Sequence, residues 1–262
     1  MNLADLTEAA HDADGVAPFN EATTLALAAG AEPRYSVIDG HGAVLGFGDD
    51  PVELVVRPDE RRTGHGHRLL AEAIEAGETR FWAHGDLPAA QTLAASAGLS
   101  AVRTLLVLRR GVDAVQVREL DGVVIRAAVE ADTDAIVAVN GRAFTSHPEQ
   151  GAMDRADFER RAASDWFDWD GLFVAERDGE VVGFHWTKIE DGIGEVYVVG
   201  VDPTQQGTGL GTALTARGLQ HLVDAGVEAI DLYVEGDNEP ALAVYRRLGF
   251  SEHAKDVLYA VS

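Results

Sequence analysis

The chain has 262 residues, of which 46% are hydrophobic and 25% are charged, and its formal net charge is −23. This hydrophobic fraction can fill one large core or two smaller ones, whereas such an acidic surface repels nucleic acid and anionic lipid, so neither is expected as a partner. Because cysteine is absent, disulfides and thiolate metal sites are excluded. With no signal-peptide pattern and no apolar run of membrane-spanning length, the expectation is a cytoplasmic monomer.

The N-terminal half carries a short apolar strand, Leu54 to Val56, that stops before Pro58. A glycine-rich turn follows, then a helical pattern, a second short strand ("TRFWAH") and a second helix that closes on Gly98. Proline cannot donate to a strand ladder, and glycine permits positive φ and a close approach of the backbone to a ligand. The order therefore predicts a strand–turn–helix unit.

The segment 113–122 is predicted to be a linker between two domains, residues 1–112 and 123–262. After it, "VVIRAAVEADTDAIVAVNGRAF" restarts with a strand and a helix. An aromatic stretch containing "WFDWDGLF" comes next, and then a hairpin with Asp178-Gly179 as its turn. Strands and helices alternate with hairpins at one side, so the predicted class is mixed α/β.

The strand–turn–helix order returns in "VGVDPTQQGTGLGTALTARGL", Val199 to Leu219. Val56, Pro58 and the following glycines keep the same spacing as their counterparts here, which predicts a duplicated domain. A helix that begins after a glycine turn points unpaired N–H groups and its positive dipole end outward, so the turn is a candidate anion site. A tight turn without a ligand and a Rossmann dinucleotide site remain open as alternatives, whereas a P-loop lacks its Gly-Lys-Ser/Thr.

Two motifs in the second half give this turn a more specific meaning. The pattern V-x-P-x-x-Q/R-x-x-G-x-G/A resembles the acyl-CoA turn of the GCN5-related N-acetyltransferase (GNAT) superfamily, and "NEPALAVYRRLGF" resembles its second motif. The resemblance implies two tandem GNAT domains, each a splayed mixed β-sheet flanked by helices, with acetyl-CoA in the splay beside the strand of Val198. In the C-terminal half the implied acetyl-CoA contacts are Val199, Gly200, Val201, Gln206, Gly207, Thr208, Gly209, Leu210, Gly211, Thr212, Asn238, Glu239, Pro240, Ala241, Leu242 and Ala243. In the N-terminal half they are Leu54, Val55, Val56, Arg62, Thr63, Gly64, His65, Gly66 and His67.

The series "WFDWDGLF", "GFHWTK" and "GEVYVVGVDP" is similar to the mycothiol synthase family of actinobacterial tandem acetyltransferases. This resemblance implies transfer of acetyl from acetyl-CoA to the cysteinyl amine of desacetylmycothiol, a cysteinyl-glucosaminyl-inositol. It implies Glu195 as general base and substrate contact and Tyr245 as general acid. The other implied substrate contacts are Glu21, Asp168 (with Asp165 and Asp170 as alternatives), Lys188 and Tyr233.

The N-terminal half departs from the active pattern, since Ala94 stands where Tyr245 is expected and Leu87 where Asn238 is expected. Asp50 falls near the position of Glu195 without a clear motif around it. We therefore expect this half to hold acetyl-CoA without doing chemistry. No further ligands at metal spacing accompany the turn histidines, so no metal is expected. An acetyltransferase for another small amine or a protein N-terminus, and a non-catalytic acetyl-CoA sensor, remain as alternatives.

Overall fold

The computed structural model describes residues 2–145 and 151–261. The chain divides into two compact units. Unit 1 comprises Met1–Leu106, Glu235–Asp237 and Ala254–Ser262, and unit 2 comprises Val107–Val234 and Asn238–His253. The end of the chain is therefore part of the unit built from the N-terminal half. The boundaries 1–112 and 123–262 remain a prediction, and residues 111–120 carry neither helix nor strand.

Unit 1 is a mixed sheet in the order β1-β2-β3-β4-β11-β5, with β3 and β4 parallel and the pairs β1–β2, β2–β3 and β4–β11 antiparallel. Strand β2, between β1 and β3, is buried along its whole length because both of its faces are covered. Val44 belongs to a core cluster with Leu69 of α3, whereas Leu45 belongs to one with Leu6 of α1. The elements are α1 (Leu3–Asp14), α2 (Glu21–Ala28), β1 (Tyr35–Ile38), β2 (Gly42–Gly46), β3 (Val52–Val56), η1 (Pro58–Glu60), α3 (His65–Glu75), β4 (Arg80–Ala83), η2 (His84–Asp86), α4 (Pro88–Ser96) and β5 (Leu99–Arg110).

The strands of unit 2 follow the order β5-β10-β9-β8-β7-β6. β9 and β10 run parallel, and the pairs β6–β7, β7–β8 and β8–β9 run antiparallel. The hairpin of β7 and β8 turns at Asp178-Gly179, as predicted, and both turn residues have positive φ. The elements are β6 (Val124–Ala127), η3 (Glu130–Asp132), α5 (Thr133–Ala143), α7 (Arg155–Ala162), η4 (Trp169–Gly171), β7 (Leu172–Arg177), β8 (Glu180–Glu190), β9 (Ile193–Val201), η5 (Pro203–Gln205), α8 (Leu210–Asp224), β10 (Ala229–Glu235) and α9 (Glu239–Arg247). The last strand, β11 (Ser251–Val261), belongs to unit 1 from Ala254 onward.

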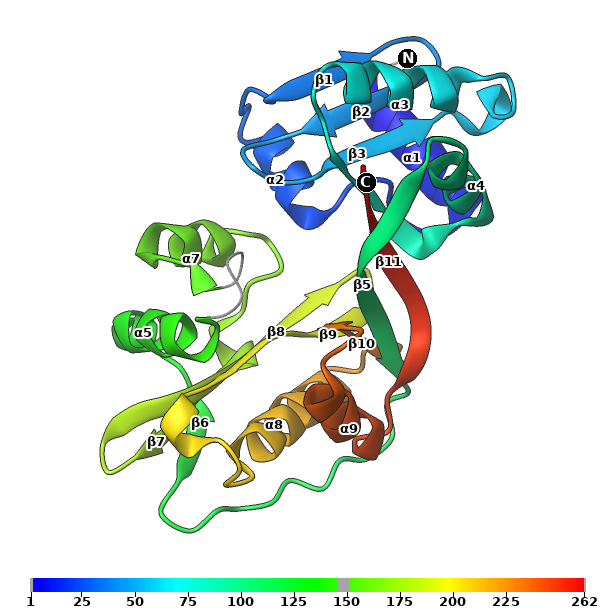
Figure 1. Ribbon diagram of the computed structural model, residues 1–262. Helices are drawn as coiled ribbons and strands as arrows, with labels where there is room; N and C mark the ends of the chain where they lie inside the picture. Colours follow the sequence, from blue (N-terminus) through cyan, green and yellow to red (C-terminus); the bar gives the residue numbers. More distant parts are fainter. Residues whose placement is uncertain (1, 146–150, 262) are drawn as a thin grey trace. The chain divides into compact units, whose positions relative to one another are not determined.

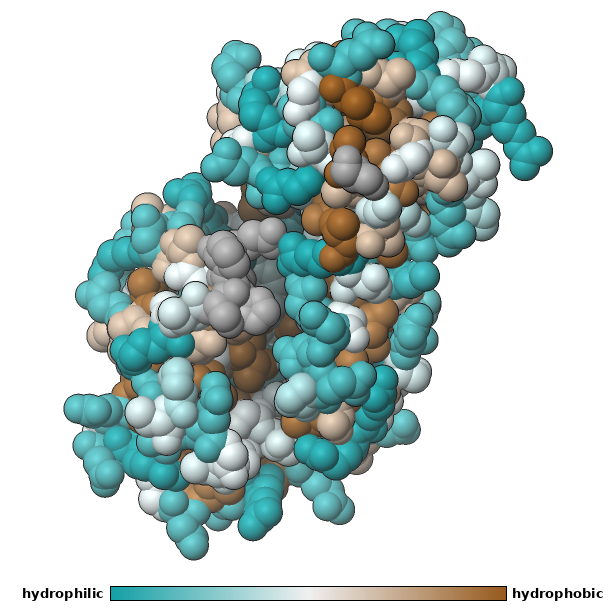
Figure 2. Space-filling view, viewed as in Figure 1, coloured by the Kyte–Doolittle hydropathy of each residue, from teal (hydrophilic) through white to brown (hydrophobic). Residues whose placement is uncertain are grey.

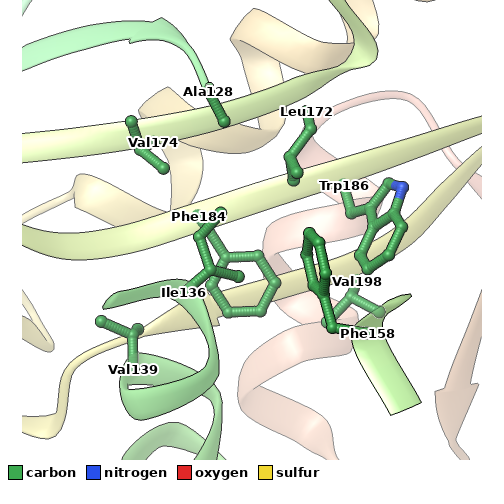
Figure 3. Close-up of a cluster of buried hydrophobic side chains, with 9 residues drawn as sticks. All are labelled: Ala128, Ile136, Val139, Phe158, Leu172, Val174, Phe184, Trp186 and Val198. Atoms are coloured by element: carbon green, nitrogen blue, oxygen red, sulfur yellow. The ribbon is translucent and has the colours of Figure 1, made fainter. Parts of the chain in front are cut away.

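Helices cover both faces of the unit 2 sheet (Figure 1). On β8, Phe184 packs with Ile136 of α5, while the next residue, His185, contacts the carbonyl oxygen of Leu214 in α8 through Nδ1 at 2.9 Å. Successive strand residues point to opposite faces, so α5 and α8 lie on opposite sides. Figure 3 shows the core on the α5 side, where side chains from α5, α7, β7, β8 and β9 gather, with the fully buried Phe184 near the middle and Trp186 at one side. The mixed α/β architecture confirms the predicted fold class.

One β-bulge decides which residues of β9 face α5. Trp186 pairs with Val198 and Thr187 pairs with Val196, so Tyr197 is an extra residue in β9. Tyr197 and Val198 both pack on the core of the α5 side. The bulge shifts by one residue the alternation of β9 side chains between the two faces of the sheet. The next residue of β9 that faces the α5 side is therefore Glu195. Bulges commonly re-aim side chains next to active sites.

The face shown in Figure 2 is mostly hydrophilic, in keeping with the net charge of −23. Within the described part of the chain, no helix is both long enough and apolar enough to span a lipid bilayer.

Candidate active site

The glycine turn of unit 2 joins η5 to α8 and has the backbone that the sequence predicts. Gly207 has φ 78° and Gly209, the N-cap of α8, has φ 88°, a left-handed conformation that suits glycine. Among the described residues, no side chain caps the start of this helix. The first N–H groups of α8, from Leu210 to Thr212, therefore point into the turn without a partner in the helix, and the positive end of the dipole of this fifteen-residue helix lies there.

Asp202 fixes the entrance to this turn. Its carboxylate accepts hydrogen bonds from the backbone N–H of Thr204 at 2.9 Å, from the Thr204 hydroxyl at 2.7 Å and from Nε of Arg142 at 2.6 Å. The Thr204 hydrogen bonds and the Arg142 guanidinium lower the pKa of Asp202 to about 2. The carboxylate is therefore charged throughout the physiological range and holds the strand end in place.

Glu195 lies where two parallel strands separate. The pairing of β9 with β10 is confined to three positions and ends with Glu195 opposite Asp231. Arg109 of β5 holds Asp231 with two hydrogen bonds, from Nε at 2.6 Å and from a terminal nitrogen at 2.7 Å. Beyond this fork, β9 continues to the glycine turn without pairing to β10 among the described residues. The fork is the splay that the fold class requires, and Glu195 stands at its apex.

The side chains around Glu195 combine charge with aromatic rings. Lys188, directly opposite Glu195 on β8, is only 9% exposed. Its Nζ lies 3.0 Å from a carboxylate oxygen of Glu190 and 5.1 Å from the ring centre of Trp166. On the same side, Arg161 of α7 donates a hydrogen bond to the Tyr197 hydroxyl at 2.6 Å. The structure thus brings Glu195 and Lys188 together.

The second motif forms α9 in unit 2. Asn238 caps this helix by accepting the backbone N–H of Ala241 at 3.2 Å, and Leu242 is buried on its inner face. Tyr245 packs edge-on against Phe250, with 5.9 Å between ring centres. Burial raises the pKa of the Tyr245 hydroxyl, so it keeps its proton at neutral pH. A neutral hydroxyl is the form that can donate a proton.

The remaining predicted substrate residues are more scattered. Tyr233 is 51% exposed on β10, two residues beyond Asp231 and on the same face. Asp168 is exposed and caps η4 by accepting the backbone N–H of Asp170 at 2.9 Å. Glu21 is the first residue of α2 in unit 1. The contacts expected of these three residues stay predictions.

Unit 1 repeats the turn with different side chains. Pro58 opens η1, and Gly64 caps α3 with φ 94°, again with no side-chain cap among the described residues. His67 lies 2.9 Å through Nε2 from the hydroxyl of Ser96, whereas the ring of His65 stacks on that of His41 with 3.8 Å between centres. Sequence reasoning missed His41 because it comes from the turn between β1 and β2.

Sequence reasoning also missed a buried charge network at the fork of unit 1. Nε2 of His84 lies 2.5 Å from a carboxylate oxygen of Glu53, and Nδ1 lies 3.1 Å from one of Asp256. Glu53 also accepts the backbone N–H of Asn20 at 2.8 Å. Burial lowers the pKa of His84, but the hydrogen bonds to Asp256 and Glu53 outweigh it and raise that pKa to about 9. No local pattern in the sequence links these residues.

Comparison with known proteins agrees with this geometry. Residues 141–250 match the acetyltransferase (GNAT) family. A mycothiol acetyltransferase of Thermomonospora curvata is 48% identical over 97% of this chain and 91% of its own length. Among solved structures, a GCN5-related N-acetyltransferase from Sphaerobacter thermophilus superposes with TM-score 0.71 at 20% identity, covering 98% of this chain and 90% of that one. A tandem GNAT protein from the clavulanic acid biosynthesis pathway gives TM-score 0.69 at 19% identity, covering 98% and 92%. The chain therefore belongs to the mycothiol acetyltransferase family.

Proposed function

We propose that this chain transfers the acetyl group of acetyl-CoA to the cysteinyl amine of desacetylmycothiol, in the last step of mycothiol formation. The observation that carries the proposal is the placement of Glu195 at the fork of β9 and β10, on the strand that leads into the glycine turn. Membership of the mycothiol acetyltransferase family supplies the acceptor, and the fork and turn supply a site for the donor. The GNAT family as a whole uses acetyl-CoA.

The glycine turn fits the pyrophosphate of the donor. Backbone N–H groups at the start of α8 and positive φ at Gly207 and Gly209 form a cradle for an anion. No Cβ blocks the approach at either glycine, and the strand Val199–Val201 borders the same opening. We assign Val199–Val201, Gln206–Thr212 and Asn238–Ala243 to donor binding.

Glu195 is proposed as the general base. The acceptor amine is mostly protonated near neutral pH and must lose a proton before or while it attacks the thioester carbonyl. Glu195 takes that proton, directly or through one water, as the C–N bond forms. Lys188 lies directly opposite it on β8.

Tyr245 is proposed as the general acid. When the C–S bond breaks, the sulfur leaves with the electron pair and needs a proton. The raised pKa of Tyr245 keeps that proton available. Side chains thus provide both proton transfers, and this chemistry uses no metal.

The acceptor carries a sugar, an inositol and a free amine, which suit a surface of mixed polarity. Lys188, Tyr233 and Asp168 of unit 2 are proposed to contact it. Hydroxyl groups pair with carboxylates and ammonium groups, and the ring of Trp166 beside Lys188 offers an apolar wall.

We assign unit 1 to acetyl-CoA binding without turnover, through Leu54–Val56 and Arg62–His67. Its turn keeps the backbone of the unit 2 turn. At its fork, however, the parallel strands carry the Glu53–His84 pair, and Ala94 stands where the acid is expected. The donor is a cytoplasmic metabolite, so we place the reaction in the cytoplasm, carried out by a monomer that binds neither nucleic acid nor membrane.

The test incubates the purified chain with acetyl-CoA and desacetylmycothiol, with amino sugars and a short peptide as control acceptors. Product CoA is separated by chromatography, because the acceptor has a thiol of its own that thiol reagents would also detect. Rapid CoA formation with the cysteinyl acceptor alone supports the proposal. Turnover with a different amine would move the function to that acceptor, and donor binding without any turnover would make the chain a sensor.

A further inference from the structure

Unit 1 gathers three metal-ligating side chains that the acetyl transfer does not use. His41 lies in the turn between β1 and β2, Glu60 ends η1, and His65 begins α3. One ligand atom from each lies within 4.8 Å of the others. A carboxylate oxygen of Glu60 is 3.5 Å from Nδ1 of His41 and 3.7 Å from Nε2 of His65.

We propose that His41, Glu60 and His65 bind a divalent first-row transition-metal ion, with Zn²⁺ as the best match. A tetrahedral zinc ion with bonds of about 2.0–2.1 Å separates neighbouring ligand atoms by roughly 3.4 Å. The distances from the Glu60 carboxylate oxygen to the two histidine nitrogens, 3.5 and 3.7 Å, are close to this ligand–ligand separation. Two imidazoles and one carboxylate also form a ligand set that zinc uses when a fourth position is left to water.

Nδ1 of His41 provides an independent sign of a missing partner. This nitrogen is buried, and no hydrogen bond to it is found within the described residues. A buried polar atom without a partner is costly, and a metal ion at this point would supply one. The same nitrogen faces Glu60 at 3.5 Å.

The backbone around the three ligands is held in place by other contacts. The carboxylate of Asp39 accepts the backbone N–H of His41 at 2.7 Å and that of Gly42 at 3.0 Å, which fixes the β1–β2 turn. The Thr63 hydroxyl donates to the carbonyl oxygen of Glu60, which ties η1 to the glycine turn. Such outer contacts reduce the ordering that an ion must impose on its ligands.

The two imidazole rings must turn for both nitrogens to reach one ion. They stack with 10° between their planes, whereas a bound metal lies in the plane of each ring. The side chain of His41 is 44% exposed and that of His65 is 22% exposed, so both have room to rotate. The backbone N–H groups of the turn are not used by the ion and stay available to a phosphate.

Zinc binding by these three residues is independent of the proposed acetyl transfer. The matching positions in unit 2 are Gln205 and Leu210, neither of which replaces a histidine or a carboxylate as a zinc ligand. The ion is thus specific to unit 1, where it would join the β1–β2 turn to η1 and α3. Its expected role is to stabilise this part of unit 1.

The test measures Zn²⁺ binding to the tag-free, full-length chain by calorimetry in metal-free buffer, with Co²⁺ absorption as a report on geometry. One equivalent of zinc per chain is expected, with visible Co²⁺ bands typical of a tetrahedral site. H41Q, E60Q and H65Q should each weaken binding more than about tenfold, because each removes a ligand. H67Q is the matched control, since His67 lies two residues from His65 but contacts Ser96, and it should bind as the parent does.

Circular dichroism of each variant checks that it is folded, and the double variant H41Q/H65Q gives the decisive comparison. Zinc binding that survives in a folded double variant would overturn the proposal, as would the absence of binding to the parent chain at about 100 µM Zn²⁺. Loss of binding in the three ligand variants, with H67Q unaffected, would support it.

Discussion

The two glycine turns have the same backbone but different surroundings. Gly64 and Gly209 cap their helices with φ 94° and 88°, and Pro58 and Pro203 open the short helices that precede them. At the forks of the sheets the units differ. In unit 2 the parallel pairing ends at Glu195, whereas in unit 1 it reaches Glu53, beyond the equivalent residue Asp50.

The difference shows what duplication preserves. Anion binding uses backbone N–H groups and survives any side-chain change that keeps the glycines. Acid–base chemistry needs particular side chains at the fork, and in unit 1 the ion pair between Glu53 and His84 joins β3 to the end of β4 instead. Each unit therefore keeps the turn, and only unit 2 has the residues that we propose for proton transfer.

The largest effect is expected at the fork of unit 2. E195Q should lower turnover roughly 10³-fold, because the amide cannot accept the amine proton. The equivalent change in unit 1, D50N, should leave turnover unchanged. Steady-state rates across pH, with calorimetric acetyl-CoA binding as a control for the site, measure both. Equal losses in the two variants would contradict the assignment of chemistry to unit 2.

Tyr245→Phe should slow the chemical step by about 10², because the leaving sulfur then takes its proton from water. The matched control is Y259F, because the hydroxyl of Tyr259 donates a hydrogen bond to Asp86 in unit 1 at 2.8 Å. Removing that hydrogen bond should cost about 1 kcal/mol of stability and leave the rate unaltered. Single-turnover kinetics separate the chemical step from product release, and an unchanged rate in Y245F would rule out its role as the acid.

The two units should lose stability at opposite ends of the pH scale. Folding raises the pKa of His84 from 6.5 to about 9, so its contribution is complete below pH 6.5 and is lost as pH rises through 9. Burial lowers the pKa of His185 in unit 2 from 6.5 to about 4. Between these two values the unfolded chain binds a proton that the folded chain does not bind, so the folded state loses stability as pH falls from 6.5 toward 4. Each effect amounts to roughly 3 kcal/mol.

Hydrogen exchange followed by mass spectrometry measures the opening of each peptide separately, so it distinguishes the alkaline pH range in which unit 1 loses stability from the acidic range in which unit 2 does. Unit 1 peptides should exchange faster near pH 9–10, after correction for intrinsic rates, and unit 2 peptides near pH 4–5. H84Q should remove the alkaline window and leave the acidic one. Simultaneous loss of both units at either end would contradict the separation.

The smallest effect is expected in the turns themselves. Alanine at φ near 90° costs about 1 kcal/mol, because its Cβ crowds the backbone. G209A should therefore raise the KM for acetyl-CoA about fivefold. G64A carries the same strain in unit 1 and should leave that KM unchanged. A matching rise in both variants would mean that turnover depends on both turns.

The strand–turn–helix units and the mixed α/β class could be predicted from the sequence because proline, glycine and apolar periodicity act locally. The orientation of Glu195 could not be derived this way, since the bulge at Tyr197 sets it and no residue type marks a bulge there. His41 and Asp256 were missed for a different reason. Each reaches its partners from a distant segment, and only the folded chain brings them together.

The membership of β11 in unit 1 has a consequence for protein synthesis. Strand β4 pairs with Val257–Ala260, which leave the ribosome after all of unit 2, and Gly85 donates its N–H to Asp256 at 2.8 Å. When residues 1–112 have emerged, the nascent unit 1 still lacks an internal strand of its sheet. The sheet of unit 1 is therefore completed only after unit 2 has been translated, and cutting the gene at the linker would yield an N-terminal fragment with an unpaired strand edge.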